Sequence, residues 1–261
     1  MPFRDVPLTY HASKGELDVL VRLKGQTKVS VVIPAQNEAP TIGAVLDAVS
    51  ASNSHWPGVI DEILVVDDHS SDDTATVAAR HGATVTSLTG PGGKGQAMTY
   101  GLQACTGDIV VFLDADVLNT TEEFVPRMLA PLLTSESIKL VKAYYERPLH
   151  NMPTGGGRVT ELAARPILSL LFPGLGEIRQ PLAGETAGRR EVLETVGFVD
   201  AYGVEMALLI DVARNFGVSS IAQVDLGVRR HRNRPIEELR PMSVDVLRAA
   251  LSRFGVELPT N

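Results

Sequence analysis

The sequence of 261 residues contains one cysteine, Cys105, which excludes an intramolecular disulfide and a zinc site built from several cysteines. No apolar run approaches the ~20 residues that cross a membrane as a helix, and the N-terminal segment lacks the apolar core of a secretory signal. Lys and Arg number 24 against 31 Asp and Glu, which argues against a surface for duplex nucleic acid. We therefore expect a cytoplasmic protein that binds neither membranes nor nucleic acid.

The composition is that of an ordinary globular protein. Hydrophobic residues make up 44% of the chain and charged residues 21%, so a substantial core can form. The length allows one large domain or a domain with an appendage. We predict an N-terminal arm over residues 1–28, with a helical turn near 14–23, followed by one fused domain. Within it, residues 29–145 would bind one ligand and residues 146–261 would complete the site.

Short β-branched runs alternate with helix-like segments in the first half of the chain. The runs lie at residues 29–33, 60–66, 83–88 and 108–113. After the first run, Ile42, Val45, Leu46 and Val49 recur at the spacing of one helix face. This alternation is typical of βαβ units and predicts an α/β fold with a mostly parallel sheet flanked by helices.

The second half is less regular. We expect strands near 138–145 and 219–226, helices near 202–215 and 243–254, and an apolar helix broken at Pro166.

Two carboxylates, Asp114 and Asp116, directly follow the last strand-like run of the first half. Alternation points both to one side of an extended segment, and ligands of open α/β sheets bind beyond the carboxyl ends of strands. Close carboxylates repel each other unless a cation lies between them. Mg²⁺ and Mn²⁺ favour one or two carboxylates together with phosphate oxygens, so the pair predicts a metal and diphosphate site. A solvated turn or helix cap is the alternative.

A second acidic turn follows the 60–66 run at the same edge of the sheet. Asp67 or Asp68 could bind a nucleobase or ribose there, and His69 is expected to be an ordinary turn residue. Ser70 or Ser71 is expected to cap the next helix.

Three further segments offer anion-binding groups. The glycine loop 90–95 carries Lys94 at a helix start, where it suits an anion, although the loop matches neither the dinucleotide fingerprint nor a Walker A motif. The loop 154–158 places glycines and Arg158 before a helix, with Thr160 just beyond. The basic run 229–234 follows a strand, so Arg229 could bind phosphate and His231 could join Asp116 on a metal. Each segment could also be an ordinary solvated loop.

Two glutamates, Glu185 and Glu205, each lie near a glycine in a loop. Glu205 opens an apolar helix, where an acid in the first turn is favourable. We favour an ordinary structural role for both.

The segments VSVVIPAQNEAPTI, ILVVDDHSSDDT, GGKG and DIVVFLDAD resemble, in that order, the nucleotide-sugar half of GT-A glycosyltransferases. The later segments TGGGRVTEL, QPLAGE, YGVE and AQVDLGVRRHRNRP narrow the resemblance to the glucosyl-3-phosphoglycerate synthases and the related mannosyl enzymes. The resemblance covers roughly residues 29–254. It implies a GT-A fold and a retaining, Mg²⁺- or Mn²⁺-dependent transfer of glucose from a nucleoside diphosphate glucose to the 2-hydroxyl of 3-phosphoglycerate.

The resemblance also implies site residues. The donor, UDP-glucose or GDP-glucose, would contact Pro34, Ala35, Glu38, Asp68, Lys94, Asp114, Ala115, Asp116, Tyr202, Glu205 and Arg229. The acceptor would contact Gly157, Arg158, Thr160 and Asn233. The metal ligands would be Asp116 and His231. Catalysis would fall to Asp116, Arg229, Glu205 and a backbone carbonyl near Leu182.

Some features depart from the pattern of that family. The metal motif reads Asp-Ala-Asp rather than Asp-Ser-Asp, and the pair Asp68-His69 stands where a smaller Ser-Gly pair is usual. The second change leaves the choice between uridine and guanosine open. A mannosyl-3-phosphoglycerate synthase using GDP-mannose, a polyprenyl-phosphate glycosyltransferase and a nucleotide-sugar sensor without activity are the alternatives. We expect a homodimer, with the apolar segment 166–172 in the core or at the dimer interface.

Overall fold

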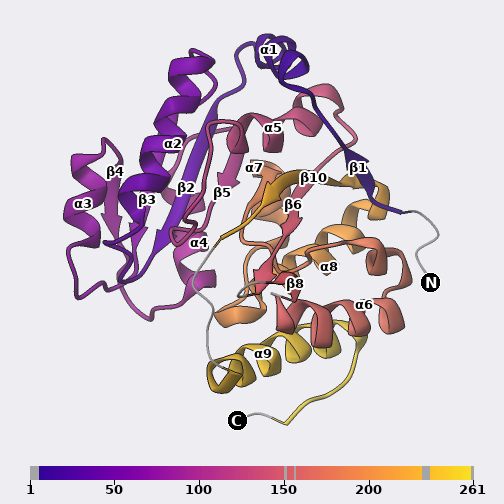
Figure 1. Cartoon of the computed structure of the whole chain (residues 1–261). Helices are drawn as coiled ribbons and strands as arrows, with labels where there is room; N and C mark the ends of the chain where they lie inside the picture. Colours follow the sequence, from indigo (N-terminus) through magenta and orange to yellow (C-terminus); the bar gives the residue numbers. More distant parts are fainter. Residues whose placement is uncertain (1–5, 150–151, 156, 231–235, 260–261) are drawn as a thin grey trace.

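The computed structural model describes residues 6–149, 152–155, 157–230 and 236–259, and its centre is one eight-stranded sheet (Figure 1). In order across the sheet the strands are β1 (Leu8–Tyr10), β10 (Ile221–Val228), β6 (Leu140–Glu146), β9 (Thr186–Arg189), β5 (Ile109–Phe112), β2 (Val29–Ala35), β3 (Glu62–Asp67) and β4 (Thr84–Ser87). Strand β9 is antiparallel to both of its neighbours, whereas the other pairings are parallel. A separate small hairpin joins β7 (Pro148–Leu149) and β8 (Met152–Gly155).

Helices supply apolar side chains to both faces of the sheet. One face packs against α1 (Lys14–Leu23), α2 (Ile42–His55), α3 (Thr74–Arg80) and α5 (Phe124–Thr134). The other packs against α4 (Lys94–Ala104), α6 (Arg165–Leu171), α7 (Arg190–Val196), α8 (Val204–Phe216) and α9 (Ile236–Phe254). Figure 1 shows α6 and α9 lying beside each other below the sheet. The predicted α/β fold with a mostly parallel sheet is confirmed.

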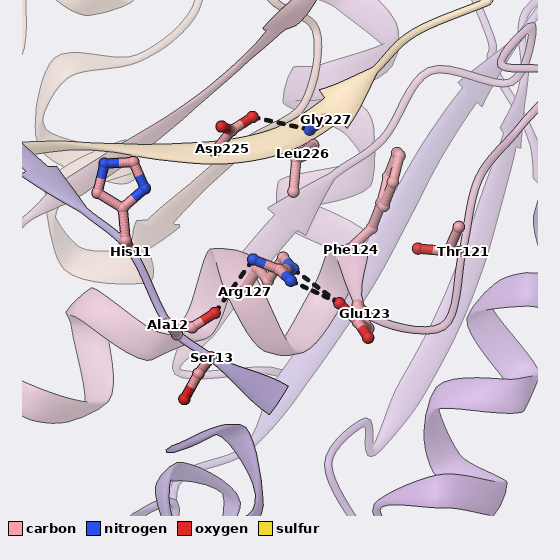
Figure 2. Close-up of a pocket in the computed structure, with 10 residues that line it drawn as sticks. All are labelled: His11, Ala12, Ser13, Thr121, Glu123, Phe124, Arg127, Asp225, Leu226 and Gly227. Atoms are coloured by element: carbon pink, nitrogen blue, oxygen red, sulfur yellow. Dashed lines mark hydrogen bonds and ion pairs between the residues drawn. The ribbon is translucent and has the colours of Figure 1, made fainter. Parts of the chain in front are cut away.

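The N-terminal segment is more structured than the predicted arm. Leu8–Tyr10 forms the edge strand β1, which pairs with β10, and α1 packs against α5. A side cavity of about 480 Å³ lies where the segment after β1 meets the ends of α5 and β10 (Figure 2). Arg127 in its lining forms an ion pair with Glu123 and donates a hydrogen bond to the carbonyl oxygen of Ala12. These contacts fasten the segment to the sheet edge.

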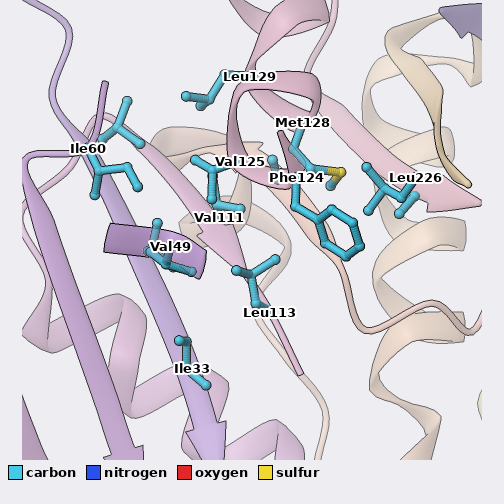
Figure 3. Packing of buried hydrophobic residues seen from close by; sticks show 14 of the residues in the cluster. Ile33, Val49, Ile60, Val111, Leu113, Phe124, Val125, Met128, Leu129 and Leu226 are labelled. Carbon is cyan, nitrogen blue, oxygen red and sulfur yellow. The ribbon is translucent and has the colours of Figure 1, made fainter. Parts of the chain in front are cut away.

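Alternation along the strands divides the core into two clusters, one on each face of the sheet. Val31 and Ile33 of β2 belong to the cluster drawn in Figure 3, together with Val49 of α2 and Met128 of α5. Val32, between them, belongs to the opposite cluster. Because both faces are covered, β2 is apolar along most of its length, as is typical of parallel strands.

Two predictions about local structure are wrong. The apolar helix is not broken at Pro166: helical structure continues through a π-helical segment (Thr160–Ala164) into α6, where Pro166 lies in the first turn and needs no intrahelical partner. Ser70 and Ser71 do not cap α3. They contact Asn37, and a carboxylate oxygen of Asp72 accepts from the backbone N–H of Thr74 instead.

The strand β9 and the helix α5 were not predicted. The four residues Thr186–Arg189 contain no β-branched run, and they become a strand because β5 and β6 pair with them from both sides. Helix α5 contains Pro126 and Pro131, which weaken its local sequence signal. Tertiary contacts therefore decide both elements.

The structure bears on two predictions about organisation. Strands from both predicted parts, 29–145 and 146–261, build the same sheet, and the boundary between the two parts stays a prediction. In the segment 166–172, Leu168 and Phe172 are buried in the core.

None of the helices in the described ranges is long and apolar enough to cross a bilayer.

Gly101 allows α4 to approach the sheet closely, and it offers a test of this packing. A Cβ atom there would lie 2.4 Å from Val32 Cγ1 and 3.1 Å from Val66 Cγ2. Because valine side chains are stiff, we expect Gly101→Ala to lower the free energy of unfolding by about 1–3 kcal/mol. Gly15→Ala, in α1 with open space around it, should be neutral or stabilising. Equal values for the two variants in urea unfolding would contradict this packing.

Candidate active site

A cavity of about 720 Å³ opens at the edge of the sheet where the parallel strands end. Near the middle of the sheet β2 is flanked by β3 on one side and β5 on the other, a change of strand order that commonly marks ligand sites in α/β proteins. The predicted site residues that line this cavity are Pro34, Ala35, Glu38, Asp68, Lys94, Asp114, Ala115, Asp116, Gly157, Arg158, Thr160, Leu182, Tyr202, Glu205 and Arg229. The other two, His231 and Asn233, lie outside the described residues.

Asp114, just beyond β5, is held between two cations. Its Oδ1 lies 2.7 Å from Lys94 Nζ at the start of α4, and its Oδ2 lies 2.6 Å from a guanidinium nitrogen of Arg229. Lys94 also pairs with Glu205 of α8 at 2.6 Å. These contacts join four distant parts of the sequence, so the carboxylate is fixed by the fold rather than by its neighbours in the chain.

Arg229 is the buried centre of a second set of contacts and is only 3% exposed. Besides Asp114, it reaches Asp116 at 3.2 Å and Glu185 at 3.1 Å, and it donates a hydrogen bond of 2.6 Å to the hydroxyl of Tyr145. Glu185 is itself fully buried. The carboxylate of Glu185 therefore belongs to the charged network of the cavity, and the ordinary structural role favoured for it from the sequence stays a prediction.

The network fixes the charge states of its members. Burial would raise the pKa of Asp114, but Lys94 and Arg229 hold it well below the usual range for aspartate. Burial would lower the pKa of Lys94, yet Asp114 and Glu205 raise it above its ordinary value. Burial likewise opposes the charge of Arg229, and Glu185 and Tyr145 keep its pKa raised. At neutral pH the cavity therefore presents two fixed cations beside an ionised Asp114.

The ends of β2 and β3 form another part of the cavity wall. Asp68 accepts a hydrogen bond of 2.8 Å from the backbone N–H of Gly93, in the glycine loop, and its other oxygen lies 2.8 Å from His69 Nδ1. Gly92 leaves no room for a Cβ atom, which would lie 2.7 Å from Asp68 Oδ1. The glycine loop is therefore held against the end of β3, and Lys94 extends from it toward Asp114.

The loop before the π-helical segment forms the opposite wall. Gly157, Arg158 and Thr160 lie where a helical run begins, and Gly157 has a φ of 70° that favours glycine. Backbone N–H groups at such a helix start attract anions. Tyr202 and Glu205 come from the short turn and first residues of α8, between this loop and Lys94.

A fully buried lysine, Lys142 of β6, lies beneath the cavity. Its ammonium donates hydrogen bonds to the carbonyl oxygen of Ala183 and, at 2.8 Å, to the hydroxyl of Thr186. These contacts secure the turn that carries Leu182 to the cavity and places Gly184 against Asp114. Lys142 was not among the predicted site residues, although a lysine inside the apolar run LVKAYY is a recognisable signal of a buried charge.

Asp116 is the carboxylate that could hold a metal ion. It is 31% exposed, and among the described residues the one ion pair of its side chain joins Oδ1 to Arg229. No group of three or more His, Cys, Asp or Glu side chains in the described part of the chain could hold a metal alone. Arg229 Nε is buried without a hydrogen-bond partner there, so the site has unused capacity for phosphate. One carboxylate beside a phosphate-binding arginine fits Mg²⁺ or Mn²⁺ bound together with a diphosphate.

The fold and the cavity define a glycosyltransferase: residues 30–196 match the family described as Glycosyl transferase family 2. Glucosyl-3-phosphoglycerate synthase of Mycobacterium tuberculosis is 45% identical over 95% of this chain and 80% of that protein. A crystal structure of that synthase in complex with Mg²⁺ and uridine diphosphate has a TM-score of 0.88 and 44% identity, covering 96% of this chain and 88% of the other. One with Mn²⁺, UDP-glucose and phosphoglyceric acid has a TM-score of 0.86 and 44% identity, covering 97% and 88%.

The chain belongs to the glucosyl-3-phosphoglycerate synthase family. The resemblance stated from the sequence motifs is thereby confirmed, and the chain is an enzyme of the glycosyltransferase class.

Lys142 gives a prediction of pH dependence. Burial lowers the pKa of Lys142 to about 8, from an ordinary value of 10.5. Between these values the unfolded chain holds a proton that the folded chain has released, so stability should rise with pH. Between pH 7 and pH 10 the wild type should gain up to about 3 kcal/mol relative to Lys142→Met in urea unfolding. Lys28→Met, at an exposed position, should run parallel to the wild type. A Lys142→Met curve parallel to the wild type would contradict this account of the buried ammonium.

Proposed function

We propose that this enzyme transfers glucose from UDP-glucose to the 2-hydroxyl of 3-phosphoglycerate with retention of configuration. The observation that carries the proposal is that one cavity combines the Asp114, Asp116 and Arg229 cluster with the glycine and arginine loop at residues 157–160. The first suits a diphosphate and the second suits another anion. The known ligands of the related synthase, UDP-glucose and phosphoglyceric acid, match this pair of sites.

The donor follows the edge of the sheet in this proposal. The nucleoside lies against Pro34, Ala35, Glu38 and Asp68 at the ends of β2 and β3. The diphosphate lies at Asp116 and Arg229, and the glucose extends toward Lys94 and Glu205. The uridine nucleotides bound by the related synthase favour UDP-glucose over the guanosine donors.

The residues of the chain stabilise the departing diphosphate by fixed charge. Arg229 is held in place by Glu185 and Tyr145, so it needs little rearrangement as negative charge develops. Asp116, and His231 as the family resemblance implies, would hold Mg²⁺ or Mn²⁺, which would supply Lewis-acid stabilisation of the leaving diphosphate. Arg158 and Thr160, together with Asn233 as the family resemblance implies, would orient the acceptor so that its hydroxyl lies close to the anomeric carbon.

Retention proceeds on one face of the sugar in this proposal. Asp114 and Glu205 are both paired with Lys94, which makes each a weak nucleophile. A covalent glycosyl intermediate on either carboxylate is therefore disfavoured. The leaving phosphate takes the proton of the acceptor hydroxyl, the carbonyl of Leu182 stabilises the reacting sugar, and Glu205 orients the sugar hydroxyls.

The homodimer and the cytoplasmic location stay predictions. In support of a dimer, Leu162 and Leu170 on the helical run 160–171 are 80% and 76% exposed. Large apolar side chains that face water on one helical run favour a contact between copies of the chain.

A panel of donors tests the function directly. UDP-glucose, GDP-glucose and GDP-mannose are each supplied with Mg²⁺, with and without 3-phosphoglycerate, and the products are identified by NMR. We expect UDP-glucose and 3-phosphoglycerate to give an α-linked glucosyl product, with little donor consumption when the acceptor is omitted. Preferential use of GDP-mannose, an inverted linkage or donor hydrolysis that ignores 3-phosphoglycerate would refute the proposal.

A further inference from the structure

Arg147 lies in the cavity lining, next to the acceptor loop. It follows β6 directly after Glu146, is half-buried and lines the cavity beside Gly157 and Arg158. A Cβ atom on Gly157 would lie 3.3 Å from Arg147 Cδ, so the loop packs directly on the arginine side chain. Its guanidinium carbon lies 5.2 Å from the centre of the Tyr145 ring, and that tyrosine is hydrogen-bonded to Arg229.

Among the residues that the structure describes, no carboxylate forms an ion pair with Arg147, in contrast to Lys94 and Arg229. Lys94 pairs with two carboxylates and Arg229 with three. Within the described ranges of the chain, Arg147 makes no hydrogen bond or ion pair, and its Nε is buried without a partner. A buried donor that the protein leaves unpaired is unusual and points to an acceptor supplied by a ligand.

The proposed acceptor carries two anionic groups, one on each carbon that flanks the reacting hydroxyl. The backbone N–H groups at the start of the helical run, together with Arg158, form a site of the kind that binds phosphate. The remaining group is a carboxylate. A planar guanidinium matches a carboxylate with two parallel hydrogen bonds, and the face of the Tyr145 ring, 5.2 Å away, attracts the guanidinium by a cation–π interaction.

We propose that Arg147 binds the carboxylate of 3-phosphoglycerate, beside a phosphate site formed by residues 157–160. This assignment rests on the proposed function and deepens it, because it names a residue that selects the acceptor. An acceptor without a carboxylate leaves the buried Nε of Arg147 without an acceptor atom, and a site built for a polar group discriminates strongly against a ligand that lacks that group.

The test compares two ligands that differ in this one group. Glycerol 3-phosphate keeps the phosphate and the 2-hydroxyl of 3-phosphoglycerate and replaces the carboxylate with a hydroxymethyl group. We expect Arg147→Gln to weaken 3-phosphoglycerate binding by about 10- to 100-fold in calorimetry without donor or metal. The inhibition constant of glycerol 3-phosphate in the transfer assay should be unchanged, as should the KM for the donor. Arg147→Lys, which keeps the charge, should recover part of the affinity.

Arg179→Gln is the matched control. Arg179 also stacks on a tyrosine, at 4.4 Å from the ring of Tyr144, but it is exposed and outside the cavity lining, so its variant should bind both ligands normally. Equal loss of both ligands in Arg147→Gln would overturn the carboxylate assignment. If the wild type binds 3-phosphoglycerate and Arg147→Gln binds it equally well, the role of Arg147 is overturned, but the proposed transferase function is not. A wild type that ignores 3-phosphoglycerate would refute the proposed function itself.

Discussion

The ion pairs of Asp114 with Lys94 and Arg229 are the contacts on which the cavity depends. They tie the end of β5 to the start of α4 and to the end of β10, and Lys94 extends the network to Glu205 of α8. A carboxylate between two cations keeps its charge and its position, so Asp114 serves as an anchor. Asp116 is separated from Asp114 by Ala115 and is the more exposed of the two aspartates. It is therefore the carboxylate that can bind a metal ion together with a diphosphate.

The sheet makes this arrangement possible by bringing distant segments to one edge. The antiparallel strand β9 lies between β5 and β6, and the turn before it delivers Glu185 to Arg229 and Gly184 to Asp114. A side chain at Gly184 would lie 2.0 Å from Asp114 Oδ1, so this close approach needs glycine. Lys142 holds the same turn from below. The proposed donor and acceptor sites thus lie on the same sheet and the same turn before β9, which favours transfer between two bound substrates.

Much of the fold and of the site could be predicted from the sequence. The runs that became β2, β3 and β5 are continuous and apolar, and Asp114 and Asp116 follow one of them directly, so their place at the sheet edge follows from general rules for α/β proteins. Strand β9 could not be predicted, because Thr186–Arg189 becomes a strand only through pairing with its neighbours. The partners of Glu185 and Lys142 depend on contacts between residues far apart in the chain, and so does the lack of a hydrogen-bond partner for Arg147 Nε among the described residues. The motifs therefore predicted many residues of the cavity lining but not Arg147, and the structure was needed to show how the charges are paired.

The most direct test is the binding of Mn²⁺ in the presence of UDP, measured by electron paramagnetic resonance for the wild type, Asp116→Asn and Asp114→Asn. If Asp114 is the anchor and Asp116 faces the metal, Asp116→Asn should lose tight Mn²⁺ binding, and Asp114→Asn should keep it while losing stability because Lys94 and Arg229 lose a shared partner. Retention of tight Mn²⁺ binding in Asp116→Asn, or its loss in Asp114→Asn alone, would contradict the division of roles between the two aspartates.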